Sequence, residues 1–246
     1  MSRYYYDLHI HSCLSPCADN DMTPANIAGM AALQGLTLVA LTDHNSCKNC
    51  PAFFTHARRY GIVPVAGMEL TTSEDIHALC LFPTLESAMS FDALVEERLI
   101  KVKNKPEIFG DQLIMNDEDE PIGVMEPLLI NATTLDLAEA YETVTSLGGV
   151  CYPAHIDRES GGLIAILGAF PEFPQYSAFE LNFRSSLDEY LTRFPELAEK
   201  QFIVSSDAHD LCSISEAENS IEIYDEPYSS AQVRRELIRT LRGGEA

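Results

Sequence analysis

The sequence predicts an α/β domain in which about seven strands form a barrel and helices pack outside it. Short apolar runs alternate with segments of helical spacing along most of the chain, which is the pattern of consecutive βαβ units. The chain has 246 residues, a length that suits one α/β barrel. Six of its seven histidines lie where an apolar run ends, as expected for residues on the loop face of a barrel.

The first half of the predicted barrel follows strand and helix signals in order. Apolar strands are predicted over residues 4–9, 36–42, 62–70 and 76–82, since continuous apolar runs suit strands that are covered on both faces. A first helix begins at Thr23-Pro24, with proline in its first turn, and Gly35 ends it. A second helix is predicted over residues 51–60, where Gly61 closes it.

Residues 83–133 break this alternation, and we predict an insertion within a single domain of residues 1–246. Residues 85–103 have helical spacing, and residues 112–115 and 123–130 flank a polar turn, so the insertion is predicted as a helix followed by a hairpin. We expect it to cap the pocket and select small substrates. A purely structural or dimer-forming hairpin is the alternative.

The second half returns to the barrel pattern. Strands are predicted over residues 149–155, 177–182 and 202–207. Helices are predicted over residues 134–147, 187–200 and 229–242.

The composition is strongly acidic, with 16 Lys and Arg residues against 38 Asp and Glu residues and a formal charge of −22. Nucleic-acid binding relies on basic side chains that displace counterions, so we expect no long nucleic acid as a partner. Metal ions would reverse the charge of a pocket locally and admit a small phosphorylated substrate. We find no apolar run near the ~20 residues of a membrane span and no signal segment, and we expect a cytoplasmic protein without a membrane partner.

The cysteines leave two interpretations open. Seven cysteines in a chain expected to be cytoplasmic predict no structural disulfide. Four of them follow the first two histidine motifs and would make a four-thiolate site if their loops meet: Cys13, Cys17, Cys47 and Cys50. Alternatively, Cys47 and Cys50 lie at the start of a helix and bind no metal.

A metal cluster is the first hypothesis for the strand-end histidines. His9 and His11 alternate along a strand, so both rings face the same side and one ion. Imidazole with carboxylate and without thiolate suits zinc, manganese or iron in a hydrolytic site. A lone histidine of this kind is more simply a buried core residue, but six at strand ends disfavour that explanation. His56, on the second predicted helix, is assigned no function.

The motifs around these residues resemble those of the polymerase and histidinol phosphatase (PHP) family of metal-dependent phosphoesterases. They are Asp7-Leu8-His9-Ile10-His11-Ser12, Thr42-Asp43-His44-Asn45, the strand-end Glu69, and Ser206-Asp207-Ala208-His209. The resemblance covers nearly the whole chain and implies a distorted seven-stranded (β/α)7 TIM-like barrel that binds two to three divalent ions, Zn, Mn or Fe. It implies His9, His11, Glu69 and Asp207 as ligands of one ion, Glu69, His77 and His155 of a second, and His44 and His209 of a third.

The third implied site departs from the family pattern. Family members often have an acid or a histidine a few residues after the His-x-His motif, and this chain has Pro16 at the commonest spacing. Cys17 or Asp19 would replace it, and Asp19 is preferred because hard oxygen ligands suit manganese or iron. A two-metal enzyme is the alternative.

The resemblance also implies a mechanism, in which a hydroxide shared by two cations attacks a phosphate ester. Glu69, which would bridge the cations, and Asp207 and His209 are the implied catalytic residues. Arg158 and Arg184 each follow a strand end and are candidate substrate-binding residues, because guanidinium pairs with phosphate through a planar fork. An ordinary surface ion pair is the alternative for each arginine. Asp43 is expected to orient a histidine.

These residues predict a hydrolase of a small phosphate ester, such as a sugar, nucleotide or histidinol phosphate. The same ions would also suit a phosphodiesterase or exonuclease that acts on nucleotide or nucleic-acid ends. A non-catalytic metal-binding module and a hydrolase of C–N bonds are further alternatives, since a fold alone does not determine function. Arginines that point into the site would favour phosphate. The sequence does not determine the oligomeric state.

Overall fold

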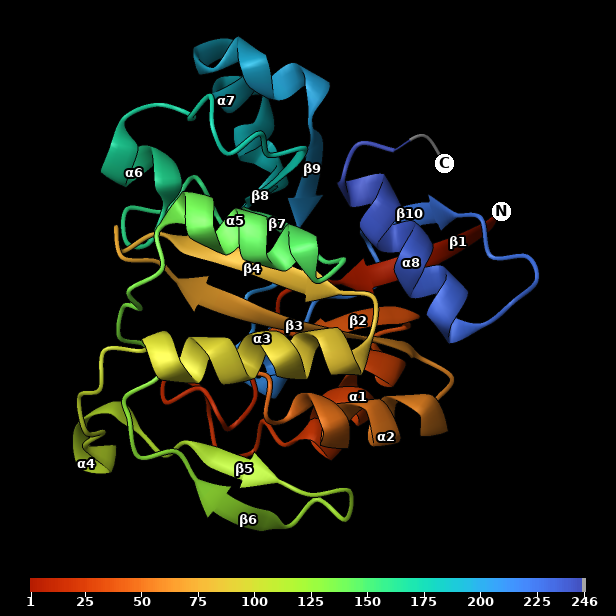
Figure 1. Cartoon of the computed structure of the whole chain (residues 1–246). Coiled ribbons are helices and arrows are strands. Elements are labelled where there is room, and N and C mark those ends of the chain that lie inside the picture. Colours follow the sequence, from red (N-terminus) through yellow and green to blue (C-terminus); the bar gives the residue numbers. More distant parts are fainter. Residues whose placement is uncertain (245–246) are drawn as a thin grey trace.

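A curled, six-stranded sheet is the centre of the molecule (Figure 1). The computed structural model describes residues 1–244. The strand order in the sheet is β10 (Ser220–Ile223), β1 (Ser2–Asp7), β2 (Leu38–Leu41), β3 (Val63–Thr71), β4 (His77–Phe82) and β7 (Val150–Pro153). β8 (Ala178–Leu181) and β9 (Gln201–Val204) form a separate parallel pair.

The strand directions bring several carboxyl ends to one edge. β1, β2 and β3 are parallel, and β4 is antiparallel to both β3 and β7, so β7 runs in the direction of β3. A bridge between Ile10 and Ala208 connects the chain after β1 with the chain after β9. The Ile156 amide donates to the Glu180 carbonyl at 2.9 Å and connects the chain after β7 with β8. The strands therefore approach a barrel at this edge.

The predicted α/β class is confirmed, whereas the (β/α)7 arrangement is not. No helix lies between β3 and β4 in this structure of residues 1–244, since the two strands are joined by residues 72–76 alone. An antiparallel pair needs only a short connection, whereas a parallel pair needs a crossover. β10 was not predicted, and it pairs antiparallel with β1.

Helices cover the outer face of the sheet (Figure 1). Thr23 Oγ1 accepts a hydrogen bond from the Asn26 amide and Pro24 is the first helical residue, as the sequence predicts. The helices are α1 (Pro24–Leu33), α2 (Cys50–Arg59), α3 (Leu85–Arg98), α4 (Pro106–Phe109), α5 (Leu137–Ser146), α6 (Leu163–Leu167), α7 (Leu187–Arg193) and α8 (Ser230–Leu241), with short 3-10 turns at Arg184–Ser186, Pro195–Glu199 and Leu211–Ser213. Over the residues described here, we find no helix that combines the length and the apolar character needed to span a membrane.

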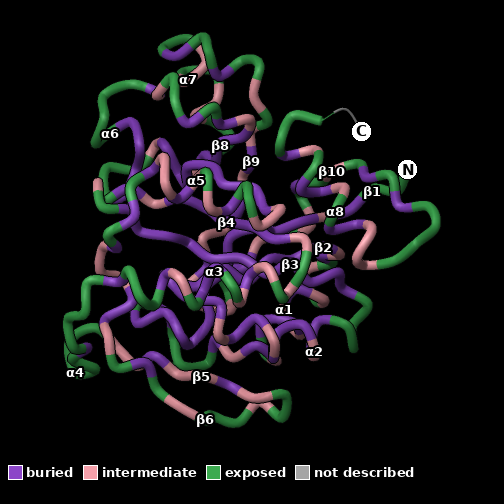
Figure 2. Tube along the Cα trace, viewed as in Figure 1, coloured by how far each residue is buried: buried purple, intermediate pink, exposed green. Residues whose placement is uncertain are grey.

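Alternate residues of each strand face two different cores, as the pleat of a sheet requires. Leu38 and Ala40 of β2 pack in a cluster with Val233 and Leu237 of α8. Val39 and Leu41 belong to the larger cluster between the sheet and the other helices. Figure 2 shows the resulting buried centre with an exposed shell of loops. The sheet is therefore a rigid support for residues at its carboxyl edge.

The insertion contains the predicted hairpin, formed by β5 (Leu113–Met115) and β6 (Pro121–Val124). The Leu113 amide donates to the Cys13 carbonyl at 2.8 Å, and Thr23 Oγ1 donates to the Asp119 carboxylate at 2.7 Å. The hairpin is therefore anchored to the loop before α1 and to the start of that helix.

Candidate metal centre

Four of the predicted ligands converge where β1, β3 and β9 end. His9 Nε2 lies 3.1 Å from His11 Nε2, and Asp207 Oδ1 lies 3.3 Å from the first nitrogen and 3.1 Å from the second. The Glu69 oxygens lie 3.4 Å from His9 Nε2 and 3.2 Å from His11 Nε2. Four ligands in a tetrahedron at ~2.1 Å from one ion are ~3.4 Å apart, so these spacings fit a divalent cation.

Glu69 is the central residue of the cluster, and its side chain is 1% exposed. Its Oε1 lies 2.8 Å from His77 Nδ1 and 2.9 Å from His155 Nε2, and its Oε2 lies 2.9 Å from His44 Nδ1. A bridge between His44 and Glu69 continues the β2–β3 pairing beyond Leu41 and holds these two residues side by side. This carboxylate therefore belongs to two of the groups of side chains that could hold a metal ion.

Potential ligand atoms form three overlapping groups, within each of which all atoms lie within 4.8 Å of one another. One group is His9, His11, Glu69 and Asp207, the second is His44, Glu69 and His77, and the third is His11, His44 and His209. Asp19 belongs to none of these groups in residues 1–244. Its backbone amide donates to the His209 carbonyl at 2.9 Å, while the residue itself is exposed, so the structure does not bring its carboxylate to the centre.

Buried atoms of the cluster lack hydrogen-bond partners within the described part of the chain. These atoms include His44 Nδ1, Glu69 Oε2 and Asp207 Oδ1. The first two are only 2.9 Å apart, yet their geometry is not that of a hydrogen bond. A buried polar atom without a partner costs about 1–3 kcal/mol, and a shared cation would satisfy several of them together. The residues present therefore fit a metal ion.

The carboxylates and imidazoles shift each other's pKa. Burial alone would lower the pKa of His11, but hydrogen bonds and attraction to Asp207 and Glu69 raise it to about 9. Burial opposes ionisation of Glu69, yet the surrounding histidines, His77 first, hold its pKa well below the ordinary value. Burial lowers the pKa of His44 to about 3 and that of His209 to about 4. Protons and cations therefore compete for the His11 side of the cluster.

A model of the PHP domain family matches residues 7–157. The chain belongs to the PHP family. The resemblance of the sequence motifs to this family of metal-dependent phosphoesterases is thus confirmed. The match includes six of the eight clustered residues, since Asp207 and His209 lie beyond it.

Two relatives of known activity match parts of this PHP protein. An error-prone DNA polymerase of Symbiobacterium thermophilum is 35% identical over 77 residues, which are 31% of this chain and 7% of the polymerase. A 5'-3' exoribonuclease of Haemophilus influenzae is 30% identical over 114 residues, which are 43% of this chain and 40% of the relative. These matches therefore span less than half the length of either relative.

Solved structures share the fold of this PHP protein. Endonuclease Q, a lesion-specific endonuclease from Pyrococcus furiosus, aligns with a TM-score of 0.66 and 20% identity over 100% of this chain and 57% of its own. A metal-dependent phosphoesterase from Bifidobacterium adolescentis gives 0.56 and 17% over 83% and 87% of the two chains. An amidohydrolase from Chromobacterium violaceum gives 0.58 and 18% over 89% and 91%.

The expectation that no long nucleic acid is a partner is wrong. An Endonuclease Q structure that covers 100% of this chain at a TM-score of 0.65 contains a 27-mer duplex with an abasic lesion at the active site. The overall charge of −22 is an average over the surface and does not describe the potential at one opening. Net charge therefore does not exclude nucleic-acid substrates for a protein of this fold.

Sequence analysis missed Glu180, a buried acid on β8 that supports the PHP centre. Its Oε1 lies 2.9 Å from His9 Nδ1 and accepts a hydrogen bond from the His155 amide at 3.2 Å. This contact turns His9 Nε2 toward the cluster, as carboxylates behind metal-binding histidines commonly do. The available signal was a single acid in the otherwise apolar strand Ala178–Leu181.

Asp43 supports the centre less directly than expected. Its carboxylate accepts hydrogen bonds from Ser12 Oγ at 2.6 Å and from Ser15 Oγ at 2.7 Å. Ser15 Oγ lies 3.0 Å from His11 Nδ1. Asp43 therefore contacts His11 through a serine hydroxyl.

The two candidate arginines have different surroundings. The Arg158 guanidinium contacts the Asp207 carboxylate, and its side chain is 44% exposed, so it lies at the opening of the centre. Arg184 donates to Asn219 Oδ1 at 2.8 Å and packs over the Phe202 ring at 5.0 Å. Phe202 lies near the start of β9, so the structure does not bring Arg184 to the cluster.

Two clustered residues have unusual backbone conformations. His155 has a φ of 24° and Asp207 a φ of 51°, in the region that favours glycine. Such conformations cost about 1–3 kcal/mol each and persist where the surroundings enforce them, often at functional sites. His155 follows β7 and Asp207 follows β9, so the backbone just beyond these strands directs both side chains into the cluster.

The cysteine loops do not form the four-thiolate site within residues 1–244, since no cysteine belongs to a group of potential ligands. Cys47 and Cys50 are buried, with sulfur atoms 3.1 Å and 3.7 Å from the Gly67 carbonyl oxygen. They therefore occupy the core at the start of α2, which is the alternative that the sequence left open.

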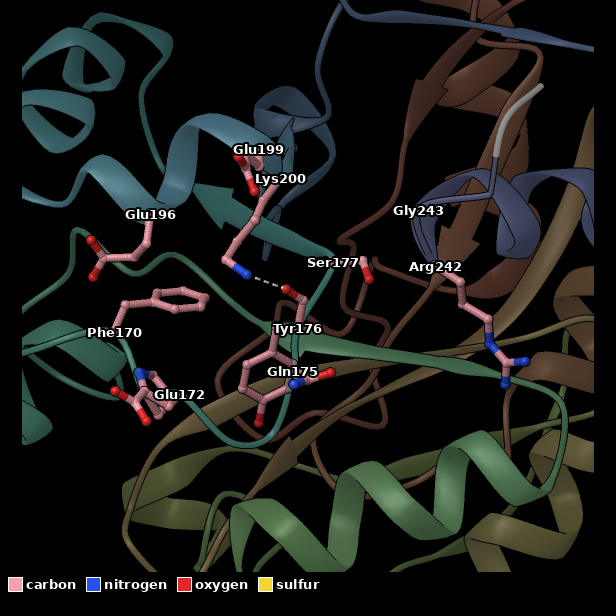
Figure 3. Close-up of a pocket in the computed structure, with 11 residues that line it drawn as sticks. Phe170, Glu172, Gln175, Tyr176, Ser177, Glu196, Glu199, Lys200, Arg242 and Gly243 are labelled. Carbon is pink, nitrogen blue, oxygen red and sulfur yellow. Dashed lines mark hydrogen bonds between the residues drawn. The ribbon is translucent and has the colours of Figure 1, made fainter.

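A separate cavity of about 730 Å³ lies beside the start of β8 (Figure 3). Lys200 Nζ donates to the Tyr176 carbonyl at 2.6 Å and Arg242 Nε to the Gly149 carbonyl at 2.8 Å, so backbone oxygens already engage both cations. The described residues that line this cavity include none of the candidate metal ligands. The cavity is thus distinct from the PHP centre.

Proposed function

We propose that this protein is a metal-dependent phosphoesterase that hydrolyses a phosphate ester at the PHP centre. The observation that supports this proposal best is the environment of Glu69. This buried carboxylate lies within 3.4 Å of imidazole nitrogens from His9, His11, His44, His77 and His155. A carboxylate that lies close to so many imidazole nitrogens, which can bind metal when neutral, is suited to bridging divalent cations.

In this proposal, His9, His11, Glu69 and Asp207 hold one ion, Glu69 holds a second with His77 and His155, and His44 and His209 hold a third. The donor set suits Zn, Mn or Fe. Bound divalent ions polarise phosphoryl oxygens and lower the pKa of water. His77 and His209 are the more exposed histidines of the cluster, at 21% and 30%, so they mark the side from which a substrate enters.

Arg158 supports a phosphorylated substrate over a C–N substrate. Its guanidinium is at the opening and contacts Asp207. A planar guanidinium matches two phosphoryl oxygens, and its partial exposure leaves it free to turn from Asp207 to an incoming phosphate. Arg158 would bind and orient the phosphoryl group while its positive charge offsets charge that develops during hydrolysis.

A nuclease is the second candidate function. The similarity to a 5'-3' exoribonuclease, 30% identical over 114 residues, favours phosphodiester bonds at a nucleic-acid end. Both candidates use the same centre and the same arginine. They differ in whether the phosphorus that is attacked carries one ester bond or two.

Metal analysis paired with an ester panel tests the proposal. Protein purified without chelator should contain two to three ions per chain, and it should release phosphate or nucleotides from a panel of phosphomonoesters, mononucleotides and oligonucleotides with added Mn²⁺ or Zn²⁺. His9→Ala should remove both metal and turnover. His56→Gln is the matched control, because His56 lies on α2 outside the cluster. Metal without hydrolysis of any phosphoester would contradict the activity, and absence of metal would contradict the site.

A further inference from the structure

One segment of this acidic protein is basic. We call residues 98–105, Arg98-Leu99-Ile100-Lys101-Val102-Lys103-Asn104-Lys105, the basic strap. It contains three of the five lysines in a chain of net charge −22. All three lysines are exposed, and the lysine ion pairs formed within the described residues belong to Lys48 instead. Arg98 pairs with the Glu139 carboxylate at 2.5 Å, so the unpaired positive charge of the strap belongs to its three lysines.

The strap is an ordered, extended segment. The Ile100 amide donates to the Ala132 carbonyl at 3.2 Å, the Leu128 amide to the Val102 carbonyl at 2.7 Å, and the Asn104 amide to the Glu126 carbonyl at 2.8 Å. It thus pairs antiparallel with residues 126–133. Alternate residues of an extended chain share one side, so Lys101, Lys103 and Lys105 form a row.

Hydrogen bonds place this row beside the PHP centre. Asn45, the residue after His44, donates through Nδ2 to the Leu129 carbonyl at 2.6 Å and the Asn131 carbonyl at 2.8 Å. The Thr133 amide donates to the carbonyl of Thr71, which pairs with His77 across β3 and β4. The partner of the strap is therefore bonded to backbone next to His44 and His77. In Figure 1, α4 follows the strap at the edge toward which the β3 arrow points.

Exposed apolar side chains accompany the lysines. Ile100 is 45% exposed, Val102 48%, Ile108 65% and Phe109 37%. Asn104 Nδ2 donates to the Gly110 carbonyl at 2.9 Å, which ties α4 and Phe109 to the strap. Figure 2 shows mostly exposed backbone around α4, where residues 105–109 are all exposed. Ile100 and Val102 alternate with the lysines and therefore lie on the other side of the strap, whereas α4 brings the exposed Phe109 ring to the end of the lysine row. A row of cations next to an exposed aromatic ring suits the backbone and the unpaired bases of a single strand.

We propose that the basic strap binds a single-stranded polynucleotide whose end enters the PHP centre. This inference rests on the proposed function, because it assigns a substrate class to that centre. A groove of about 360 Å³ lies along the strap, and Glu96 and Glu126 line it together with Lys101 and Lys103. The Glu96 carboxylate forms an ion pair with Lys48 Nζ at 2.9 Å. The acidic remainder of the surface repels a polyanion, which confines the strand to the strap.

The test measures binding without catalysis. Fluorescein-labelled 20-nucleotide RNA and DNA strands, and a DNA duplex, are titrated in EDTA with the whole protein at several salt concentrations. Lys101→Gln/Lys103→Gln/Lys105→Gln is compared with Arg3→Gln/Arg235→Gln/Arg239→Gln, which removes the same charge from exposed positions on β1 and α8. Loss of three phosphate contacts should weaken single-strand binding at least about tenfold and make the slope of log K against log salt shallower by about 2.

Unchanged binding in the lysine variant would overturn the inference, and so would an equal loss in the arginine control. Binding of duplex as tightly as single strand would also contradict it. With metal present, the lysine variant should keep kcat/KM on a mononucleotide and show a raised KM on the 20-mer. Binding in EDTA is independent of turnover, so an inactive centre would refute the proposed function while the titration still decides the role of the strap.

Discussion

Competition between a proton and a metal ion for His11 predicts how the metal affinity depends on pH. The Asp207 and Glu69 carboxylates favour the charged ring of His11 and raise its pKa to about 9. A metal ligand must be a neutral imidazole, so an ion has to displace this proton at pH 7. Over the two pH units from 7 to 9 the displacement costs about 2.7 kcal/mol at 1.36 kcal/mol per unit. His11 alone should therefore raise metal affinity about 50-fold between pH 7 and pH 9, since it is still half protonated at pH 9.

Metal affinity rises with pH because the metal ion binds only after the imidazole has released its proton. The pKa of His9 is also raised well above its ordinary value, although burial opposes this, because Asp207, Glu180 and Glu69 attract the charged ring. His9 therefore adds to the slope in the same direction. His44 and His209, whose pKa values are about 3 and about 4, are already neutral at pH 7 and contribute nothing above it.

The assay is competition for Zn²⁺ or Mn²⁺ between the protein and a chromophoric chelator from pH 6.5 to pH 9. The chelator is calibrated at each pH and the ionic strength is kept constant. His11→Gln should reduce the slope of log affinity against pH by about one, since one displaced proton is lost. A metal affinity that stays flat between pH 7 and pH 9 would refute the assignment of His11 as a proton-competed ligand.

Three further predictions follow from the surroundings of the centre. Without metal, the raised pKa of His11 adds stability that is fully present below its unfolded pKa near 6.5 and is lost as pH rises through about 9, so the Tm of metal-free protein should fall over this window. A Tm that is unchanged from pH 6 to pH 9 would contradict this. Glu180→Gln should lower metal affinity about 10–100-fold with the fold retained, as circular dichroism and chelator competition would show, and wild-type affinity would refute the support of His9. Gly161→Ala and Gly168→Ala should each lose about 1–2 kcal/mol in urea unfolding because both positions have positive φ, at +69° and +76°. Only Gly161→Ala should also weaken metal binding, since its Cβ would lie 2.8 Å from the His77 ring, whereas nothing lies within 4 Å at Gly168.

Local patterns in the sequence predict the positions of most helices and strands but not the directions of the strands in the sheet. The predicted strands at 62–70 and 76–82 differ by about one residue from β3 and β4, because apolar composition and flanking turn residues determine them locally. The antiparallel direction of β4 depends instead on pairing with β3 and β7. The predicted helix 85–103 ends at Arg98, where Leu99 turns to an extended conformation and the basic strap begins.

In the candidate site, too, local patterns predict some features and tertiary contacts determine the others. Strand ends bring eight predicted ligands together, because the parallel strands present their carboxyl ends at one edge and the antiparallel β4 presents its amino end, with His77, at the same edge. Arg184 also follows a strand end, but its side chain packs over Phe202. Tertiary contacts determine this direction, and no local sequence pattern predicts it. Glu180 was missed because one acid in an apolar strand has no periodic signal. Capping by the insertion stays a prediction.

The β3–β4 hairpin limits how this protein can vary among its descendants. Glu69 and His77 lie on adjacent antiparallel strands whose register pairs Thr71 with His77. A shift of one residue would turn one of these side chains to the opposite face of the sheet. Insertions and deletions within residues 72–76 would therefore separate Glu69 from His77, so this short connection should keep its length wherever the centre is retained.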